Sequence, residues 1–458
     1  MVVVVLDNGG SSIKAGILFN RKPEPRIVPN AVIRAPGDKA TYIGHEFHQR
    51  CRDFSSLSYR LPLEKGFVVD WDAQKAVWDG LFSDEVLNVN PTESTLVITE
   101  PYFNLPKLQE VYDQFVFEEY EFQGLFRATP ASFIPHGTLL GETPPECSLI
   151  VDSGFSFTHV VPIMQGQVVW EAVKRLDLGG KLLTNHLKEL ISFRQWNMME
   201  ETYMMNHVKE TCCYVAQDFG QDLEVCRNDP KNSIVQEYVL PDLTKQNAGR
   251  IRQPNEVLLE TDQVLTMGNE RFSVPEIMFR PDDVGLKQVG IAGTIASSIA
   301  LLPEDLQGLF WANIGLIGGN TEFPGFRTRL IPELESLAPM GTDVAIYHAD
   351  KPSLAAYEAA CAFASQPHFE SEIAITREEY LEYGSTAVRR KCPDWRAGPP
   401  PPPATSRKGK GRSEGPSSDV EESEDSESDT DDGDRSVVRR GKRKAGRAAG
   451  KVTVSRKK

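Results

Sequence analysis

A turn that begins with a carboxylate and continues with small residues gives the first chemical signal in this sequence. Asp7 ends an apolar run and leads into Gly9, Gly10 and Ser11. A phosphate group bound at such a turn needs backbone N–H groups that approach it closely and a cation that offsets its charge. The turn residues supply the amides and a hydroxyl, and Lys14 supplies an ammonium for a β- or γ-phosphate.

The same layout returns 145 residues later, where the apolar run 149–151 ends in Asp152 and a second small-residue turn follows. If the two turns face each other across a cleft, Asp7 and Asp152 can orient the waters of one Mg²⁺, which usually keeps several waters and takes few carboxylates. A third turn, 318–321, follows the apolar run 314–317. A tight turn without a ligand is the ordinary explanation of any one of these features, but together they favour a phosphate and metal site.

Each carboxylate-led turn is expected at the tip of a β-hairpin, because a second apolar run follows it, at 13–18 and at 160–163. Two such hairpins, each opening its own half of the chain, predict two similar α/β domains that face each other across a cleft. Apolar residues that recur on one face predict a helix over 182–191, and Gly179 and Gly180 precede it.

Length and composition exclude several classes of protein. The chain has 458 residues, of which 40% are hydrophobic and 25% charged, as in soluble globular proteins of two to four domains. No apolar run approaches the roughly 20 residues of a membrane-spanning helix. The opening apolar run lacks a basic flank, which predicts a buried strand rather than a signal peptide. The seven cysteines contain no C-x-x-C pair, which favours a reducing compartment without disulfides or structural zinc.

Charge is distributed unevenly along the chain. The whole sequence carries −15, but residues 393–458 hold 16 Lys/Arg against 12 Asp/Glu, a surplus of +4. Residues 1–392 therefore carry 34 basic against 53 acidic side chains, which is −19. A body this acidic repels phosphate backbones at long range and favours basic partners, histones among them.

Residues 393–458 have the composition of a disordered tail. A run of five prolines, 399–403, is followed by basic residues, then by the block 419–434, in which ten of sixteen residues are acidic, and then by the basic end of the chain. With so few apolar side chains, burial cannot offset the ordering entropy of this tail. The basic runs are consistent with a nuclear localisation signal and a contact to nucleic acid or histones, and a passive solubilising tail is the alternative.

The sequence resembles a known protein family. The motifs match the two phosphate loops and the adenosine loop of actin, and further segments match it outside these loops, so the resemblance covers essentially 1–392. Among actin-related proteins, the segments 98–104, 117–120 and 180–189 most resemble a nuclear subunit of the chromatin remodeller that exchanges an ordinary nucleosomal histone for its Z variant. The motifs of the loops are Asp7-Asn8-Gly9 with Lys14-Ala15-Gly16, Asp152-Ser153-Gly154 with Thr158-His159, and Gly318-Gly319-Asn320-Thr321 with Phe323-Pro324-Gly325.

The resemblance implies an actin-like, ribonuclease-H-like duplicated α/β fold of two lobes around a cleft that holds ATP and Mg²⁺. The first lobe would comprise 1–133 and 340–392, with a small subdomain at about 33–62. The second would comprise 134–339, with a small subdomain at about 181–262. Carried over residue by residue, the cofactor-binding set is Asp7, Gly9, Gly10, Ser11, Lys14, Asp152, Gly154, Gly180, Lys209, Glu210, Gly318, Gly319 and Phe323, with Asp7 and Asp152 facing the metal.

Departures from the family pattern bear on activity. Hydrolysis in actin needs a glutamine and a histidine that position the attacking water. The histidine is present as His159, but an ungapped alignment puts Pro130 at the glutamine position. Gln123 is a candidate substitute only if the alignment takes a gap. Phe155 replaces a second acidic residue, and Gly10-Ser11 inverts the family's Ser-Gly order. Water positioning is worth a large factor in phosphoryl transfer, so we expect binding without efficient turnover and no catalytic residue.

Filament formation is also disfavoured by the sequence. Only the residues 35–41 remain where actin carries a longer loop that docks on the next subunit, and a filament needs a repeating heterologous interface. The polar segment 224–260 diverges from actin and is a candidate surface for a dedicated partner.

Three interpretations compete: a non-filamentous nuclear scaffold subunit, an active cytoskeletal actin-like ATPase, and a small-molecule kinase on the same fold. We favour the first. Its expected partners are other remodeller subunits, histones including the Z variant, and nucleosomal DNA, in the nucleus and also the cytoplasm, without a membrane or a filament.

Overall fold

The computed structural model describes residues 2–18, 24–229, 231–242 and 248–392. The predicted tail, 393–458, lies outside the described residues. None of the helices in these described ranges combines the length and the apolar character needed to cross a bilayer.

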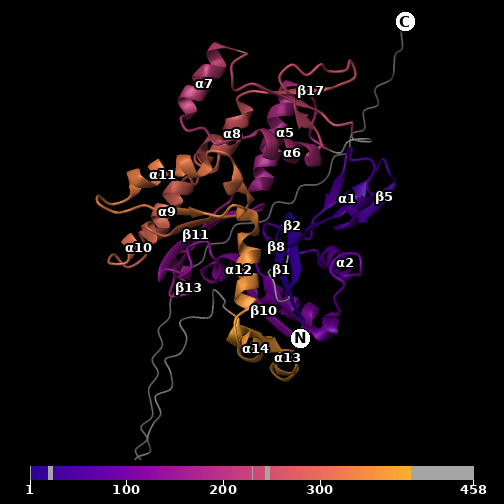
Figure 1. Cartoon of the computed structure of the whole chain (residues 1–458), viewed down its shortest axis with the longest axis vertical. Helices are drawn as coiled ribbons and strands as arrows, with labels where there is room; N and C mark the ends of the chain where they lie inside the picture. Colours follow the sequence, from indigo (N-terminus) through magenta and orange to yellow (C-terminus); the bar gives the residue numbers. More distant parts are fainter. Residues whose placement is uncertain (1, 19–23, 230, 243–247, 393–458) are drawn as a thin grey trace, which may run out of the picture. The chain divides into compact units, whose positions relative to one another are not determined.

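The first hairpin forms the centre of a six-stranded sheet, ordered β20-β10-β9-β1-β2-β3 (Figure 1). Strand β1 pairs antiparallel with β2 and parallel with β9, so it is buried between two neighbours. This agrees with the predicted strand, which is apolar along almost its whole length. The strands are β1 Val2–Asn8, β2 Ser12–Leu18, β3 Arg26–Pro29, β9 Ser94–Thr99, β10 Gly124–Ala128 and β20 Ile375–Thr376.

The second hairpin repeats this arrangement in another sheet, ordered β13-β12-β11-β18-β19, with β14 paired to β12. Strand β11 pairs antiparallel with β12 and parallel with β18, as β1 does with β2 and β9. The two predicted hairpins are therefore confirmed, and their sheets share one topology at the centre. The strands are β11 Cys147–Ser153, β12 Thr158–Met164, β13 Gln167–Val168, β14 Lys174–Leu176, β18 Ile314–Ile317 and β19 Ile346–His348.

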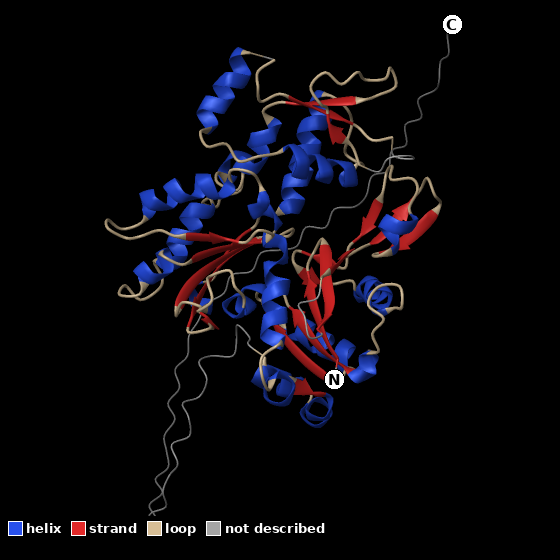
Figure 2. Ribbon diagram, in the orientation of Figure 1, coloured by secondary structure: helices blue, strands red, loops and turns tan. Residues whose placement is uncertain are grey.

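Smaller sheets accompany the two large ones (Figure 2). One has the order β5-β4-β6, another β16-β15-β17, and β7 pairs with β8. In the first of these, β4 pairs with β5 from Ala35↔Ala40 onward, so only 36–39 connect the two strands where actin has its longer loop. The strands are β4 Val32–Ala35, β5 Ala40–Ile43, β6 Ser58–Arg60, β7 Leu63–Glu64, β8 Phe67–Val68, β15 Gln236–Val239, β16 Arg250–Ile251 and β17 Val264–Met267.

Helices cover the sheets, and the helix predicted over 182–191 is confirmed as α5. Its buried residues include Leu183, Leu187 and Ile191, which lie on one face of the helix. Helix α12 contacts β1 and β2. The helices are α1 Glu46–Arg50, α2 Trp71–Phe82, α3 Pro106–Gln114, α4 Pro130–Phe133, α5 Gly180–Arg194, α6 Thr202–Cys212, α7 Phe219–Asn228, α8 Glu270–Glu276, α9 Ile291–Ile299, α10 Gln307–Trp311, α11 Phe326–Leu337, α12 Ala355–Ala364, α13 Arg377–Tyr383 and α14 Ser385–Lys391.

Two hydrophobic cores pack against the large sheets, and the first core also includes Ile150 and Ile317 of the second sheet. The first core contains Val4 and Val5 of β1 with Trp78 of α2, and the second contains Leu149 of β11 with Leu316 of β18. A third, smaller cluster centres on Ile33, Phe47 and Phe54 beside the β5-β4-β6 sheet. The carboxylate-led turns follow directly after β1 and β11, which are buried along nearly their whole length. Each turn is therefore attached to a well-packed strand.

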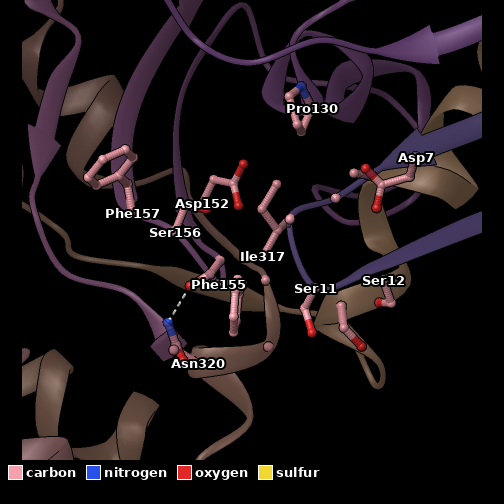
Figure 3. A pocket seen from close by; sticks show the side chains of 18 of the residues that line it. Asp7, Ser11, Ser12, Pro130, Asp152, Phe155, Ser156, Phe157, Ile317 and Asn320 are labelled. Carbon is pink, nitrogen blue, oxygen red and sulfur yellow. Dashed lines mark hydrogen bonds between the residues drawn. The ribbon is translucent and has the colours of Figure 1, made fainter. Parts of the chain in front are cut away.

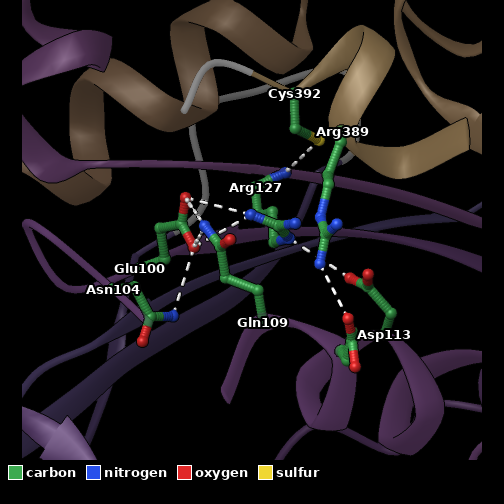
Figure 4. A network of polar contacts seen from close by, with 8 residues as sticks. Glu100, Asn104, Gln109, Asp113, Arg127, Arg389 and Cys392 are labelled. Atoms are coloured by element: carbon green, nitrogen blue, oxygen red, sulfur yellow. Dashed lines mark hydrogen bonds and ion pairs between the residues drawn. The ribbon is translucent and has the colours of Figure 1, made fainter. Parts of the chain in front are cut away.

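A buried ion network joins β10 to the elements beside it (Figure 4). Arg127 of β10 has a side chain with no exposed surface, and its guanidinium contacts Glu100 at 3.0 Å and Asp113 at 3.2 Å. Its backbone N–H donates to the Cys392 sulfur at 3.3 Å. Burial raises the pKa of Asp113 to about 6, although Arg127 opposes that shift. The network therefore fixes β10, α3 and the last described residue to one another.

Candidate nucleotide site

One cavity of about 510 Å³ lies between the turns of the two hairpins. Figure 3 shows Asp7 and Asp152 on opposite sides of it, with Pro130 on the wall between them. Every residue that the sequence assigned to cofactor binding lines this cavity: Asp7, Gly9, Gly10, Ser11, Lys14, Asp152, Gly154, Gly180, Lys209, Glu210, Gly318, Gly319 and Phe323. Their contact with a nucleotide stays a prediction.

The first turn holds its carboxylate and its ammonium together. Asp7 and Lys14 face each other in the register of the β1–β2 hairpin, and Lys14 Nζ lies 3.2 Å from Asp7 Oδ2. The Thr99 hydroxyl donates to the other carboxylate oxygen at 2.9 Å. A Cβ on Gly9 would lie 2.8 Å from the Ser12 carbonyl oxygen, closer than side chains allow. Glycine is therefore required for this tight turn.

The second turn carries Asp152 opposite His159 in the register of the β11–β12 hairpin. Burial raises the pKa of Asp152 to about 6; the hydrogen bond from Tyr102 opposes this shift, and the nearby Asp7 charge adds to it. Burial also lowers the pKa of His159 to about 3, with a further contribution from Arg175. The imidazole is therefore neutral at physiological pH.

The third turn is joined to the second by a side chain. Asn320 donates through Nδ2 to the Gly154 carbonyl oxygen at 2.7 Å and to the Ser153 hydroxyl at 3.1 Å (Figure 3). Gly318 has a φ of +89°, and a Cβ there would lie 2.3 Å from the Ser153 carbonyl oxygen. A side chain at Gly318 would separate β18 from β11, so the two turns approach only because this residue is glycine.

Lys209 and Glu210 lie on α6 at the edge of the cavity. Lys209 is 4% exposed, and its ammonium donates to the Thr184 hydroxyl at 3.0 Å and to Asn206 Oδ1 at 2.9 Å. Burial lowers the pKa of Lys209. Asn206 also donates through its amide nitrogen to Glu210 Oε1 at 2.8 Å. The lysine thus secures α6 to α5, while the glutamate stays at the cavity edge.

The two candidates for the water-positioning residue lie at opposite ends of β10. Pro130 begins α4 after the carboxyl end of β10 and lines the cavity. Gln123 precedes β10 at the opposite end of that strand, and its amide donates to the Glu121 carbonyl oxygen. Gln123 does not line the cavity. Pro130 has no polar side-chain group, and Phe155 adds an apolar side chain to the same cavity. That Pro130 stands at the water-positioning site stays a prediction.

Four residues with contacts in the site lie in segments or motifs that match the family, but none was assigned an individual role from the sequence: Thr99, Tyr102, Ser153 and Asn320. Thr99 and Tyr102 follow from the position of β9, whose carboxyl end lies beside that of β1 in the parallel pair. Residues after the carboxyl ends of adjacent parallel strands commonly face a ligand site. That signal was available in the sequence only through the order of the strands.

The residues present fit a nucleoside triphosphate with magnesium. The cavity has a volume within the usual range for ligand sites, and glycines of all three turns line it. The Gly9 N–H, which the sequence assigned to phosphate, donates instead to the Asp7 carbonyl oxygen at 3.1 Å. Lys14 supplies a cation, and Asp7 and Asp152 supply two carboxylates, as suits an ion that keeps most of its waters. In the described part of the chain, no group of three or more His, Cys, Asp or Glu side chains is placed to hold a metal ion directly.

Comparison with known proteins agrees with the fold. The family model described as Actin matches residues 1–393. The chain is 47% identical over 427 residues to Actin-like protein ARP6 of Cryptococcus neoformans, with 87% of each chain covered. It is 36% identical over 398 residues to Actin-related protein 6 of Drosophila melanogaster and 35% identical over 427 residues to that of Arabidopsis thaliana, with 85% of this chain and 99% of each relative covered. The predicted actin fold is thus confirmed, and the chain belongs to the actin family.

Proposed function

We propose that this chain is a non-filamentous scaffold subunit of a Swr-type ATP-dependent chromatin-remodelling complex, which exchanges an ordinary nucleosomal histone for its Z variant and so supports transcriptional regulation. The chain binds ATP with Mg²⁺ but hydrolyses it poorly. The relatives named Actin-related protein 6 support this group within the actin family. The resemblance stated above supplies the remodeller and the histone.

One observation carries the proposal: the cavity retains the means to bind phosphate but lacks a polar group at the water-positioning site. Gly9, Gly10 and Lys14 remain at the first turn, whereas the apolar side chains of Pro130 and Phe155 also line the cavity. A proline cannot hold the attacking water, and orientation of that water supplies much of the rate in phosphoryl transfer. Bound ATP then stabilises the folded chain, because a ligand of the native state alone shifts the folding equilibrium.

The short connection 36–39 between β4 and β5 supports the absence of a filament. An open filament needs one surface of a subunit to dock repeatedly on a different surface of the next. The hairpin here offers four connecting residues where actin extends a docking loop, so one side of that interface is reduced.

The charge of the body supports basic partners. Residues 1–392 carry −19, which attracts histones and repels DNA unless other subunits intervene. The proposed contact with nucleosomal DNA therefore belongs to the complex and to the basic parts of the tail. The chain acts in the nucleus and is also present in the cytoplasm, where it is made.

Co-purification from nuclei, followed by native mass spectrometry, tests the proposal. A scaffold subunit is expected in stoichiometric association with other remodeller subunits. Recovery of the chain in polymer would instead support the cytoskeletal ATPase, and recovery alone with a phosphorylated small molecule would support the kinase. Either result would overturn the proposal.

A further inference from the structure

Segments from both sides of the cavity meet beside it, at a place that none of the sequence motifs assigned. On one side, β6 leads into the β7–β8 hairpin, whose residues Leu63 and Phe67 line the cavity. On the other side, α6 carries Asn206 and Glu210, which also line it. Tyr203 lies about one turn before Asn206 on the same helix. A contact between the β5-β4-β6 sheet and the start of α6 therefore holds two walls of the cavity together.

Tyr203 inserts its ring into the hydrophobic cluster of the β5-β4-β6 sheet. Its ring centroid lies 5.6 Å from that of Phe47 and 5.3 Å from that of Phe54. Both phenylalanines are buried, at 1% and 4% exposed, and the tyrosine is partly buried against them. Aromatic pairs at such distances and tilts contribute more than the area that they bury. The other members of this cluster all lie within residues 31–61, so the ring joins α6 to a separate part of the chain.

A polar contact lies beside the aromatic one. The Ser56 backbone N–H donates to both carboxylate oxygens of Glu201, each at 3.3 Å, and the Ser56 hydroxyl donates to Oε1 at 3.3 Å. Ser56 has a φ of +49°, which non-glycine residues adopt rarely. Such a conformation persists where the surrounding structure holds it, and it occurs often at functional sites. Here the acceptor that holds it is two residues before Tyr203.

The tip of the β7–β8 hairpin makes a second contact between the two sides. Lys65 and Gly66 form its two-residue turn, with φ values of +48° and +81°. A Cβ on Gly66 would lie 3.2 Å from the ring of Phe157, so the hairpin tip packs on that ring. The guanidinium of Arg175 also packs on it, 4.6 Å from the centroid. The cavity is thus bridged at two places, by the hairpin tip and by Tyr203.

We infer that Tyr203 controls how long nucleotide stays in the cavity, because nucleotide leaves only after this ring has left the cluster of Phe47 and Phe54. The inference deepens the proposed function and rests on the ATP binding proposed there. Asn206 and Glu210 move with Tyr203, since one helix carries all three. Withdrawal of the ring separates that wall from the opposite one. The step is slow because it exposes apolar surface of both the ring and the cluster to water.

The test is release of a methylanthraniloyl-labelled ATP from the full chain with Mg²⁺, followed by stopped-flow fluorescence after addition of excess unlabelled ATP. Tyr203→Ala removes the ring and is expected to speed release by about tenfold or more, the scale of one lost aromatic contact. Tyr203→Phe keeps the ring and should release the analogue at nearly the parent rate. Thermal melting checks that each variant folds. Should Tyr203→Ala fail to fold, Tyr203→Leu takes its place with the same expected direction.

Phe219→Ala is the matched control. Phe219 of α7 is also partly buried, and it meets Phe272 of α8 edge to face with centroids 5.4 Å apart. Both rings come from the same side of the cavity, and neither lines it. The variant loses the same kind of contact without separating the two walls, so it should keep the parent's release rate.

Alkylation of Cys51 in the nucleotide-free chain gives a second readout. Cys51 belongs to the cluster that Tyr203 joins and is 9% exposed. Burial raises the pKa of its thiol to about 11, so the thiol reacts slowly while the cluster is closed. N-ethylmaleimide, with peptide mass spectrometry, should modify Cys51 several-fold faster in Tyr203→Ala than in the parent or in Phe219→Ala.

Equal release rates in Tyr203→Ala and the parent would overturn the inference and leave the proposed ATP binding in place. Equal acceleration in Tyr203→Ala and Phe219→Ala would also overturn it, because lost stability would then explain the effect. Faster release without faster alkylation of Cys51 would overturn it as well. Failure of the parent to bind the analogue or ATP would overturn it together with the proposed nucleotide binding. Co-purification with remodeller subunits is scored separately and judges the scaffold role alone.

Discussion

The ring of Tyr203 meets the ring of Phe47 edge to face, with centroids 5.6 Å apart and 79° between the planes. Phe54 lies 5.3 Å from the same tyrosine, and Glu201 accepts from the Ser56 backbone N–H at 3.3 Å. Helix α6 is thereby attached to the β5-β4-β6 sheet in the first part of the chain. The same helix carries Lys209 at the cavity edge, so it contacts the site and this sheet together.

Replacing Tyr203 tests the contribution of this contact to stability. Tyr203→Ala removes a partly buried ring from the cluster around Phe47 and Phe54, and we expect it to lower the free energy of unfolding by about 1–2 kcal/mol. Urea denaturation measures the change, and Tyr203→Phe should retain most of the stability. An unchanged midpoint in Tyr203→Ala would show that the contact contributes nothing.

The buried network around Arg127 gives a larger expected effect. Arg127→Ala removes the cation beside Glu100 and Asp113, which stay inside the protein, and loss of one partner of a buried ion pair costs about 3–5 kcal/mol. Lys107→Ala is the control, since Lys107 is 88% exposed in its pair with Glu110 and should contribute less than about 1 kcal/mol. Equal changes in the urea midpoint for the two variants would contradict this distinction.

These two features also show where prediction from the sequence ends. The hairpins and α5 follow from local apolar patterns, and the turn residues follow from the chemistry of phosphate binding, so all were predicted. Arg127 and Tyr203 were not, because their partners come from distant segments or from a neighbouring strand. An arginine in a strand is ordinarily exposed, and only the assembled sheet shows that Arg127 is enclosed. Tyr102 was missed for the same reason.

The pKa of His159 predicts a dependence of stability on pH. Its pKa is depressed from 6.5 to about 3 in the folded chain, so between these values the unfolded state binds the proton and the folded state does not. Stability from this group is therefore complete above pH 6.5 and is lost as pH falls toward 3. Asp152 acts in the opposite sense: its raised pKa adds stability that is complete below pH 3.8 and lost as pH rises through about 6.

His159→Gln separates these contributions. Between pH 7 and pH 4.5 the variant should lose less stability than the parent, by on the order of a few kcal/mol, because it no longer carries a group that protonates only on unfolding. Urea midpoints at several pH values measure the difference, and the other histidines are the same in both proteins. Parallel pH profiles for variant and parent would refute the role given to His159.

Pro130 predicts slow turnover of bound ATP. Single-turnover phosphate release from the isolated chain should be far slower than from polymerised actin. Pro130→Gln places an amide side chain at the first position of α4, where a backbone N–H has no partner within the helix, so the substitution should leave the helix intact. We expect it to raise the rate of phosphate release by at least about tenfold. Rapid release by the parent, abolished in His159→Ala, would show instead that the natural site is catalytic.

The tail gives a prediction that depends on charge alone. Deleting 399–458 removes the acidic block 419–434 and the basic runs that flank it, and should reduce nuclear entry and weaken contact with nucleosomes. The slope of log affinity against log salt is negative, and each lost contact to a DNA phosphate should reduce its magnitude by about 0.9. Imaging of the truncated chain and nucleosome binding at several salt concentrations measure the two effects. Normal nuclear entry, assembly and histone exchange by the truncated chain would leave the scaffold role to the body and show that the tail is dispensable.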